Sequence, residues 1–219
     1  MRFIDYQDQH AGETCVIVGN GPSLRDVPLS FLKKRPTFGT NRIYLHAEGF
    51  LPTYYCAVNP LVIEQSLAEI CAIPAQTAKF IAAPFAEQVP GSFPLRSAGS
   101  PLFSFAPSEY IYEGYTVTFV CLQLAFFMGF RTVLLVGVDH RFITNGTPNA
   151  EAVWEGNDPN HFTESYFKDA RWHNPDLERS AHAYVLAEKA FRENGRRVLN
   201  LTRDTALDVF TKEPLKKWM

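Results

Sequence analysis

Residues 14–24, TCVIVGNGPSL, decide the fold of this 219-residue chain. The run Thr14–Val18 has the apolar composition of a strand that is buried on both faces. It ends in a Gly-Asn-Gly-Pro-Ser turn, which leads directly into the start of a helix. A buried strand followed by a tight turn and a helix predicts the first unit of an α/β fold.

The rest of the chain repeats this alternation of short apolar runs and longer segments of helical period. A mostly parallel sheet with helices on both faces is the expected result, in a Rossmann-like, doubly wound α/β arrangement. The expected strands after the first are residues 37–40, 54–58, 79–82, 132–138 and 197–200. The expected helices are residues 61–70, 118–128 and 177–194.

The last of these helices has the clearest boundaries. Asn174 and Pro175 are expected to supply its N-cap and first residue, and Gly195 its C′ residue. Two stretches, residues 84–107 and 144–173, are rich in turn-forming residues and show no sustained period. We predict one domain over 1–219, with its core at about 14–210 and a long loop or lid at about 144–173.

Composition limits the classes of partner. The net charge is −2, which argues against a phosphate-tracking surface, so no nucleic-acid partner is expected. The longest apolar run, residues 119–130, is too short to span a bilayer, which leaves only peripheral membrane contact. With four single cysteines and no leader-like start, we expect the protein to be cytoplasmic, with reduced thiols.

The turn after the first strand is suited to an anion. Gly19, Asn20 and Gly21 allow close approach of the backbone, while Pro22 and Ser23 fit the start of a helix, where N–H groups are exposed. The turn is neither a Walker A loop nor a GxGxxG motif. A tight turn without a ligand remains an alternative.

Asparagines follow three of the expected strands, at Asn20, Asn41 and Asn59. Ligands of open α/β sheets bind beyond the carboxyl ends of strands, so the three amides are expected to face one crevice and contact a ribose or base. The alternative is that each asparagine only forms its own turn.

The order of these motifs resembles the MptE-like family, named after an archaeal 6-hydroxymethylpterin diphosphokinase. The resemblance is carried by the 19–24 turn, Asn41, Asn59-Pro60, Thr116-Val117-Thr118 and residues 135–139, and it extends over about residues 14–210. The chain is more distantly similar to bacterial CMP-sialic-acid-dependent sialyltransferases and to the central domain of motility accessory factors.

The resemblance implies a nucleotide-sugar site. In the sialyltransferases the equivalents of Asn20, Asn41 and Asn59 hold the nucleotide, and a histidine at the position of His173 is the general base. The chain departs from them at Thr118, where they have glycine, and it lacks their tyrosine pair, although Arg141 stands near one of the two positions. Thr116 and Thr118, at the start of a helix, and Arg141 are therefore added to the expected nucleotide site.

Two further residues could contribute chemistry. His161 is a second candidate proton acceptor, because an imidazole titrates near cytosolic pH. Asp139, directly after a buried strand, could bind Mg²⁺, accept a hydrogen bond from a substrate hydroxyl, or cap a turn. A metal site that combined it with nearby histidines and Asp158 has no diagnostic spacing, so no metal ligands are assigned. The aromatic residues of the 144–173 loop either stack on a sugar or pack against one another.

The favoured function is a sialyltransferase-like glycosyltransferase that uses a CMP-type nucleotide sugar to build surface polysaccharide or glycoconjugate, with a glycan acceptor and no required cofactor. One alternative is a 6-hydroxymethylpterin diphosphokinase, which would need ATP and Mg²⁺. Another is a nucleotide-binding module without catalytic activity. The sequence predicts neither the sugar nor the oligomeric state.

Overall fold

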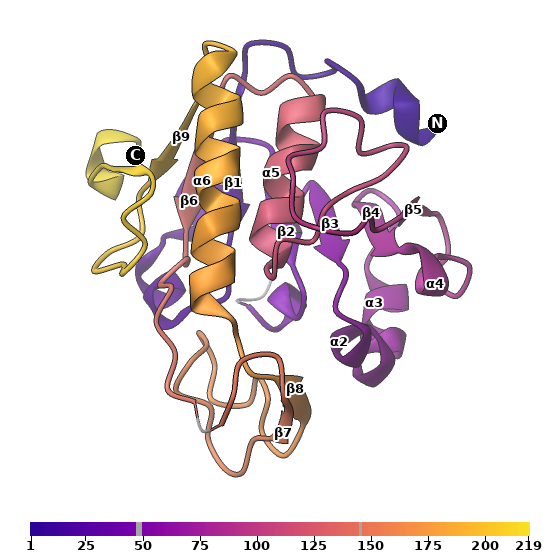
Figure 1. The fold of residues 1–219 in the computed structure, drawn as a ribbon, viewed down its shortest axis with the longest axis vertical. Coiled ribbons are helices and arrows are strands. Elements are labelled where there is room, and N and C mark those ends of the chain that lie inside the picture. Colours follow the sequence, from indigo (N-terminus) through magenta and orange to yellow (C-terminus); the bar gives the residue numbers. More distant parts are fainter. Residues whose placement is uncertain (47–49, 145) are drawn as a thin grey trace.

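An eight-stranded parallel sheet forms the centre of the molecule in the computed structural model, which describes residues 1–46, 50–144 and 146–219 (Figure 1). Its strand order is β10-β9-β6-β1-β2-β3-β4-β5, and each pairing along it is parallel. The strands are β1 Thr14–Val18, β2 Thr37–Thr40, β3 Tyr54–Ala57, β4 Ala78–Ala82, β5 Ser92–Leu95, β6 Thr132–Val136, β9 Arg197–Asn200 and β10 Thr211–Lys212. The predicted α/β class is confirmed.

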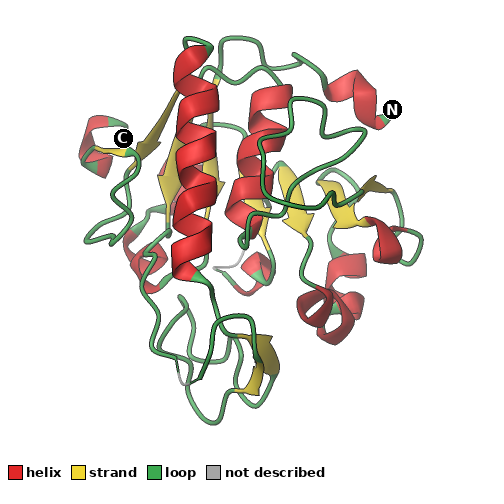
Figure 2. Ribbon diagram, viewed as in Figure 1, coloured by secondary structure: helices red, strands yellow, loops and turns green. Residues whose placement is uncertain are grey.

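The helices cover this sheet and lie around its ends (Figure 2). α5 and α6 are the two long helices and pack side by side (Figure 1). The α-helices are α1 Leu29–Leu32, α2 Pro60–Gln65, α3 Leu67–Ala72, α4 Ala83–Ala86, α5 Val117–Phe127 and α6 Leu177–Glu193. The 3₁₀ helices are η1 Phe3–Tyr6, η2 Pro22–Asp26, η3 Ile43–Leu45 and η4 Leu215–Lys217.

The sheet is doubly wound about β1. β1 pairs with β2 on one side and with β6 on the other, so the chain leaves β1 in one direction and later returns to its opposite side. Right-handed crossovers that run in opposite directions place their helices on opposite faces. The connections that follow β1 and β6 therefore run in opposite directions from a topological switch point, where such folds bind ligands.

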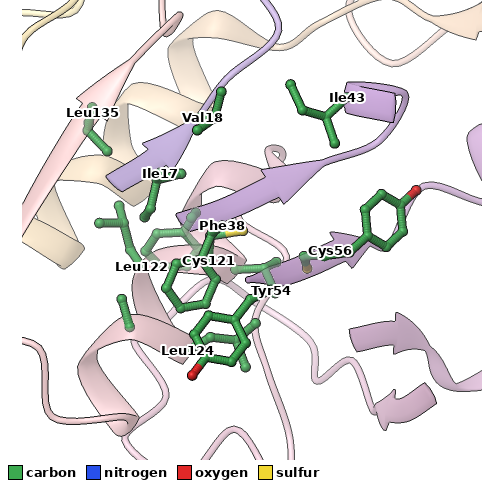
Figure 3. Packing of buried hydrophobic residues seen from close by; sticks show 14 of the residues in the cluster. Ile17, Val18, Phe38, Ile43, Tyr54, Cys56, Cys121, Leu122, Leu124 and Leu135 are labelled. Carbon is green, nitrogen blue, oxygen red and sulfur yellow. The ribbon is translucent and has the colours of Figure 1, made fainter. Parts of the chain in front are cut away.

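The core is centred on β1 and α5. Val16, Ile17 and Val18 are fully buried, and every residue of α5 after Val117 is buried. A helix that is apolar on all sides needs neighbours on all sides, and α5 contacts β1, β2, β3 and α6. Figure 3 shows Cys121 and Leu122 of this helix against Phe38 of β2.

Several predicted boundaries need correction. The strands predicted at 54–58 and 132–138 end at residues 57 and 136, and the helix predicted at 61–70 is interrupted at Ser66, whose backbone leaves the helical region. The stretch 84–107 is not purely loop, because α4 extends into it and it contains β5.

The predicted lid, residues 144–173, contains regular structure as well. β7 (Glu151–Val153) and β8 (Arg171–His173) pair antiparallel in a small separate sheet. Residue 145 of that prediction lies outside the described residues. Three-residue strands are too short to show periodicity, which explains why the sequence pattern missed them.

The predicted N-cap of α6 was wrong by two residues. Asp176 caps the helix, because its side chain accepts a hydrogen bond from Arg179 N at 3.0 Å. Asn174 still belongs to the preceding hairpin, where its backbone N–H donates to Ala150 O. At the other end, Gly195 has the positive φ of the expected C′ residue.

The switch point leaves no room for a side chain at Gly19. A Cβ there would overlap the carbonyl oxygen of Gly137, a backbone atom that cannot rotate away. We expect Gly19→Ala to lower the free energy of unfolding by about 1–3 kcal/mol in urea titrations. Gly99→Ala is the matched control, since a Cβ at Gly99 meets no atom within 4 Å and φ there is not positive. Equal stability of the two variants would contradict the prediction.

Candidate functional site

A cavity of about 900 Å³ opens at the switch point. The turns after β1, β2, β3 and β6 form one side of it, and the amino-terminal ends of α5 and α6 contribute to the other. Most of the residues predicted for the site line this cavity: Gly19, Asn20, Gly21, Asn41, Asn59, Thr116, Thr118, Asp139, Arg141, His161 and His173. Pro22 and Ser23 are not part of its lining.

Three amides of the turn after β1 are not free to bind an anion, contrary to the sequence-based expectation. Gly19 N–H donates to Val136 O, Gly21 N–H donates to Gly137 O, and Ser23 N–H donates to Asp139 Oδ1 at 3.2 Å. These donors already have acceptors within the chain, and displacing Asp139 would free only the amide of Ser23.

Asp139 caps the short helix η2. Its carboxylate accepts a hydrogen bond from the Ser23 hydroxyl at 2.7 Å as well as from the Ser23 amide. Burial raises the pKa of Asp139 above its ordinary value, and the two hydrogen bonds from Ser23 act in the opposite direction. A Cβ at Gly21 would overlap this carboxylate, so the glycine is needed for Asp139 to approach.

The three asparagines line the same cavity, but two of them also have structural roles. Asn20 Nδ2 donates to Thr40 Oγ1 at 2.8 Å and so ties the end of β1 to β2. Asn59 is the N-cap of α2, because its Oδ1 accepts from Leu61 N at 3.0 Å. Asn41 adopts a left-handed φ of 50°, and its Oδ1 is buried with no hydrogen-bond partner in the structure. The Oδ1 of Asn20 likewise has no hydrogen-bond partner among the described residues, so Asn20 and Asn41, unlike Asn59, each keep an unused amide oxygen beside the cavity.

His161 is held in a defined orientation. Its Nδ1 lies 2.7 Å from Asp158 Oδ2, and Asp158 is only 2% exposed. The imidazole stacks on the ring of Tyr166, with centroids 4.0 Å apart and planes 3° apart. A histidine oriented by a buried carboxylate is the arrangement of a general acid or base.

The segment that carries His161 is bound to the switch point by main-chain hydrogen bonds. Arg25 Nε donates to Phe162 O at 2.8 Å and Arg25 Nη2 to His161 O at 3.1 Å. Phe162 N–H donates to Asn20 O at 2.9 Å. A second arginine, Arg42, donates through its backbone N–H and its guanidinium to Tyr166. The predicted lid is therefore attached to η2 and to the end of β2.

His173 lies at the end of β8, half-buried in the same cavity. Among the described residues, none forms a hydrogen bond to its ring. In the described part of the chain, the imidazole of His173 therefore lacks a hydrogen-bond partner comparable to Asp158.

The aromatic side chains of the 144–173 region pack mainly against one another. Tyr166, Phe167 and Trp172 are each less than 9% exposed, and their rings contact those of His161, Phe142 and Trp154. Packing, the second alternative left open by the sequence, accounts for most of this aromatic cluster. Phe167 and Trp172 still present an edge to the cavity.

The opposite wall of the cavity includes residues 97–101 and 113–115, which sequence reasoning missed. Gln123 of α5 anchors the segment between them. Its Oε1 accepts from the amides of Ser104 and Tyr112 at 3.1 Å each, and its Nε2 donates to Tyr112 O at 2.7 Å. Gln123 was visible in the sequence only as an interruption of an apolar run.

Several further residues line the cavity without having been predicted for it. Arg179 stacks over Tyr115 and donates to its hydroxyl at 3.1 Å. Tyr184 lies within hydrogen-bond distance of Thr116 Oγ1. His140 faces the Tyr184 ring, and burial lowers the pKa of His140. Arg179 and Tyr184 lie on the expected α6 helix. The spacing of apolar residues along α6 does not predict which side of the helix faces the cavity.

Within residues 1–46, 50–144 and 146–219, no group of three or more His, Cys, Asp or Glu side chains could hold a metal ion. The structure therefore shows no metal-binding group made of Asp139, His140, Asp158 and His161. In the same part of the chain, no helix has the length and hydropathy needed to traverse a bilayer.

Comparisons with known proteins agree with this architecture. A family model described as 6-hydroxymethylpterin diphosphokinase MptE-like matches residues 2–145. Among solved structures, the chain is similar to the MAf glycosyltransferase from Magnetospirillum magneticum AMB-1, with a TM-score of 0.62 and 15% identity. The alignment covers 97% of this chain but 37% of that one, and at this identity it shows a shared fold. No curated protein sequence gives a significant match.

The Arg25 contacts generate a prediction about mobility. Lysine lacks the planar guanidinium through which two separate nitrogens of Arg25 donate to Phe162 O and His161 O, so Arg25→Lys should loosen residues 158–167. We expect faster amide hydrogen exchange in that segment, measured by mass spectrometry, with little change in the sheet. Arg203→Lys is the control, because the ion pairs of Arg203 with Asp26 and Asp204 are exposed. Unchanged exchange in Arg25→Lys would show that the segment is held by other contacts.

Proposed function

Because the chain belongs to the MptE-like family, whose model covers residues 2–145, we propose that it is a nucleotide-dependent transferase. The specific proposal is a sialyltransferase-like glycosyltransferase that takes a CMP-type nucleotide sugar and acts in surface polysaccharide or glycoconjugate synthesis. One observation carries it: a single cavity at the switch point gathers the asparagines, hydroxyls, arginine and histidines expected of such a site.

The size of the cavity supports a ligand in two parts. Its volume of about 900 Å³ lies at the upper end of the range for small-molecule sites, roughly 300–1,000 Å³. A nucleotide joined to a sugar needs such a space. The base and ribose would contact Asn41 and Asn59, at the ends of β2 and β3.

The phosphate of this ligand needs positive charge or free donors. Since the amides of the β1 turn are already used, we assign the phosphate to Arg141 together with the hydroxyls of Thr116 and Thr118 at the amino terminus of α5. The helix dipole adds a favourable field at that end. As the bond between sugar and phosphate breaks, these groups would stabilise the charge that develops on the leaving nucleotide.

The acceptor must lose a proton as it attacks the sugar. His161 and His173 line the cavity and can accept one. The reaction needs no metal or redox cofactor in this scheme, and the acceptor is a glycan hydroxyl. Reaction with a soluble nucleotide sugar fits the proposed cytoplasmic location.

Calorimetric titration tests the nucleotide site. We expect CMP to bind to the wild-type protein, and CDP, UDP and GDP titrated in parallel define the preference for base and phosphate. Asn59→Ser retains an N-cap for α2 but removes the side-chain amide, so it should weaken binding by about tenfold, or 1.4 kcal/mol. Asn194→Ser is the control, because Asn194 at the end of α6 does not line the cavity. Absence of binding by all four nucleotides would refute the proposal.

A second candidate follows from the family description and from Asp139. A diphosphokinase would bind ATP with Mg²⁺, and Mg²⁺ is held in such sites by one or two carboxylates together with the phosphates of the substrate. Asp139 lines the cavity and fits as one such ligand, although its carboxylate already accepts two hydrogen bonds from Ser23. The ion would neutralise phosphate charge beside this carboxylate.

Asp139→Asn separates the two candidates. Asparagine can keep both contacts to Ser23 while it removes the buried negative charge. If Asp139 holds Mg²⁺, the substitution should abolish Mg²⁺-dependent ATP binding and the release of AMP with 6-hydroxymethyl-7,8-dihydropterin. If the site takes a nucleotide sugar without metal, CMP affinity should stay the same or rise, because a charge that repels phosphate is lost. The absence of AMP release by the wild-type protein would exclude the diphosphokinase.

A further inference from the structure

The cavity wall contains a buried pair of groups with the geometry of a catalytic base and its positioning residue. We propose that His161, oriented by Asp158, takes the proton from the acceptor hydroxyl, and that His173 does not. This inference rests on the proposed transferase function and assigns its proton acceptor. It departs from the sequence-based expectation, which favoured His173.

Asp158 uses both of its carboxylate oxygens. Oδ2 accepts a hydrogen bond from His161 Nδ1 at 2.7 Å, and Oδ1 accepts one from the backbone N–H of Asn160 at 2.8 Å. A carboxylate beside Nδ1 keeps the proton of the neutral imidazole on that nitrogen. The lone pair is then on Nε2, the nitrogen that none of the described residues contacts by a hydrogen bond, on a ring that lines the cavity.

The surroundings fix the imidazole plane. Tyr166 stacks on one face at 4.0 Å, and Phe167 meets the ring at 5.2 Å with its plane nearly perpendicular. The main chain of His161 is held by Arg25, and that of Phe162 by Asn20. Asn160 donates to Ile143 O at 2.9 Å and accepts from Ile143 N at 2.7 Å, which joins the pair to the loop after β6. Such preorganisation is typical of catalytic groups and unusual for a surface histidine.

The other histidines of the cavity lack this arrangement. No described residue donates to or accepts from the ring of His173, so neither its tautomer nor its orientation is set. The side chain of His140 faces the Tyr184 ring at 5.9 Å without a carboxylate partner. Of the three, only His161 has an acidic side chain in hydrogen-bond contact.

In the proposed step, one bond of the anomeric carbon forms while another breaks. The acceptor oxygen forms a bond to the anomeric carbon of the sugar while the bond from that carbon to the phosphate oxygen breaks. The electron pair of the broken bond leaves with the nucleotide, and the hydroxyl proton moves to Nε2 of His161. The imidazolium that results is stabilised by Asp158 and returns its proton to solvent.

Asp158→Asn is the most informative variant, because it is nearly isosteric. If its oxygen keeps the hydrogen bond to Asn160 N, its NH₂ group faces His161 Nδ1 and forces the proton onto Nε2. The ring would then be unable to accept a proton. Long-range ¹H–¹⁵N spectra of the imidazoles should therefore show the Nδ1–H tautomer for His161 in the wild-type protein and a change of tautomer in Asp158→Asn.

Donor consumption gives the kinetic test. Release of CMP from CMP-N-acetylneuraminic acid is measured with water as acceptor, and UDP-N-acetylglucosamine and GDP-mannose are tested as parallel donors. His161→Gln and Asp158→Asn should each lower kcat by about 10²–10⁴-fold with nucleotide affinity unchanged, and imidazole added to His161→Ala should restore part of the rate. His173→Gln should keep kcat within roughly tenfold of wild type, below the loss expected for a base. His182→Gln serves as the control, because His182 is an exposed histidine on α6.

The outcomes separate the inference from the function it rests on. Donor consumption that survives in His161→Gln, or that is lost in His173→Gln alone, overturns the assignment and leaves the transferase proposal standing. A wild-type protein that binds no nucleotide and consumes no donor overturns both. A His161 ring in the Nε2–H tautomer in the wild-type protein also overturns the assignment, whatever the rates.

Discussion

The contact between the two turns that follow β1 and β6 is the constraint on which the rest of the site depends. Gly21 N–H donates to Gly137 O, and neither Gly19 nor Gly21 leaves room for a Cβ against the opposite turn. Parallel neighbours whose chains leave in opposite directions would ordinarily splay apart at this point. Here the backbones stay in contact, which places Asp139 against η2 and moves the open space of the cavity outward, toward the ends of β2, β3 and α5.

This contact also determines which groups of the site could interact with a negatively charged ligand. The carboxylate of Asp139 caps the amino terminus of η2, and backbone amides at the switch point donate to carbonyl oxygens of the chain. These amides would therefore contribute little to the binding of an anion. Under the proposed function, the ligand would be bound by side chains: amides at the ends of β2 and β3, hydroxyls at the start of α5, and guanidinium groups at the rim. Such a site binds through shape and hydrogen bonds and not through a strong positive field, which agrees with a net charge of −2 for the whole chain. Affinity should consequently depend only weakly on salt.

The sequence predicted the sheet and the general place of the site, because both follow from local patterns. An apolar run such as residues 14–18 specifies a buried strand, and the turn behind it lies at the carboxyl edge whatever follows. The hydrogen-bond partners of individual side chains could not be predicted in the same way. Whether Asp139 faces a ligand or Ser23, and whether His161 or His173 has a carboxylate beside it, depends on contacts between segments far apart in the chain. Asp158 and His161 are three residues apart, but no periodic pattern indicates that the loop folds them together. β7 and β8 were missed because three-residue strands have no measurable period.

Gln123 links the buried helix α5 to one wall of the cavity through a small number of hydrogen bonds. Three of them hold Ser104 and Tyr112, and the surrounding segment makes no strand of the central sheet. Apolar packing holds the same wall, because Phe103 contacts the rings of Phe119, Phe126 and Phe191, and Ile111 is fully buried in the core. Insertions or replacements between residues 97 and 115 could alter the shape of the bound molecule without disturbing the sheet, provided that the amide and this apolar packing remain. If the proposed function holds, selectivity for the acceptor could therefore diverge among relatives while the pair of His161 and Asp158 stays the same.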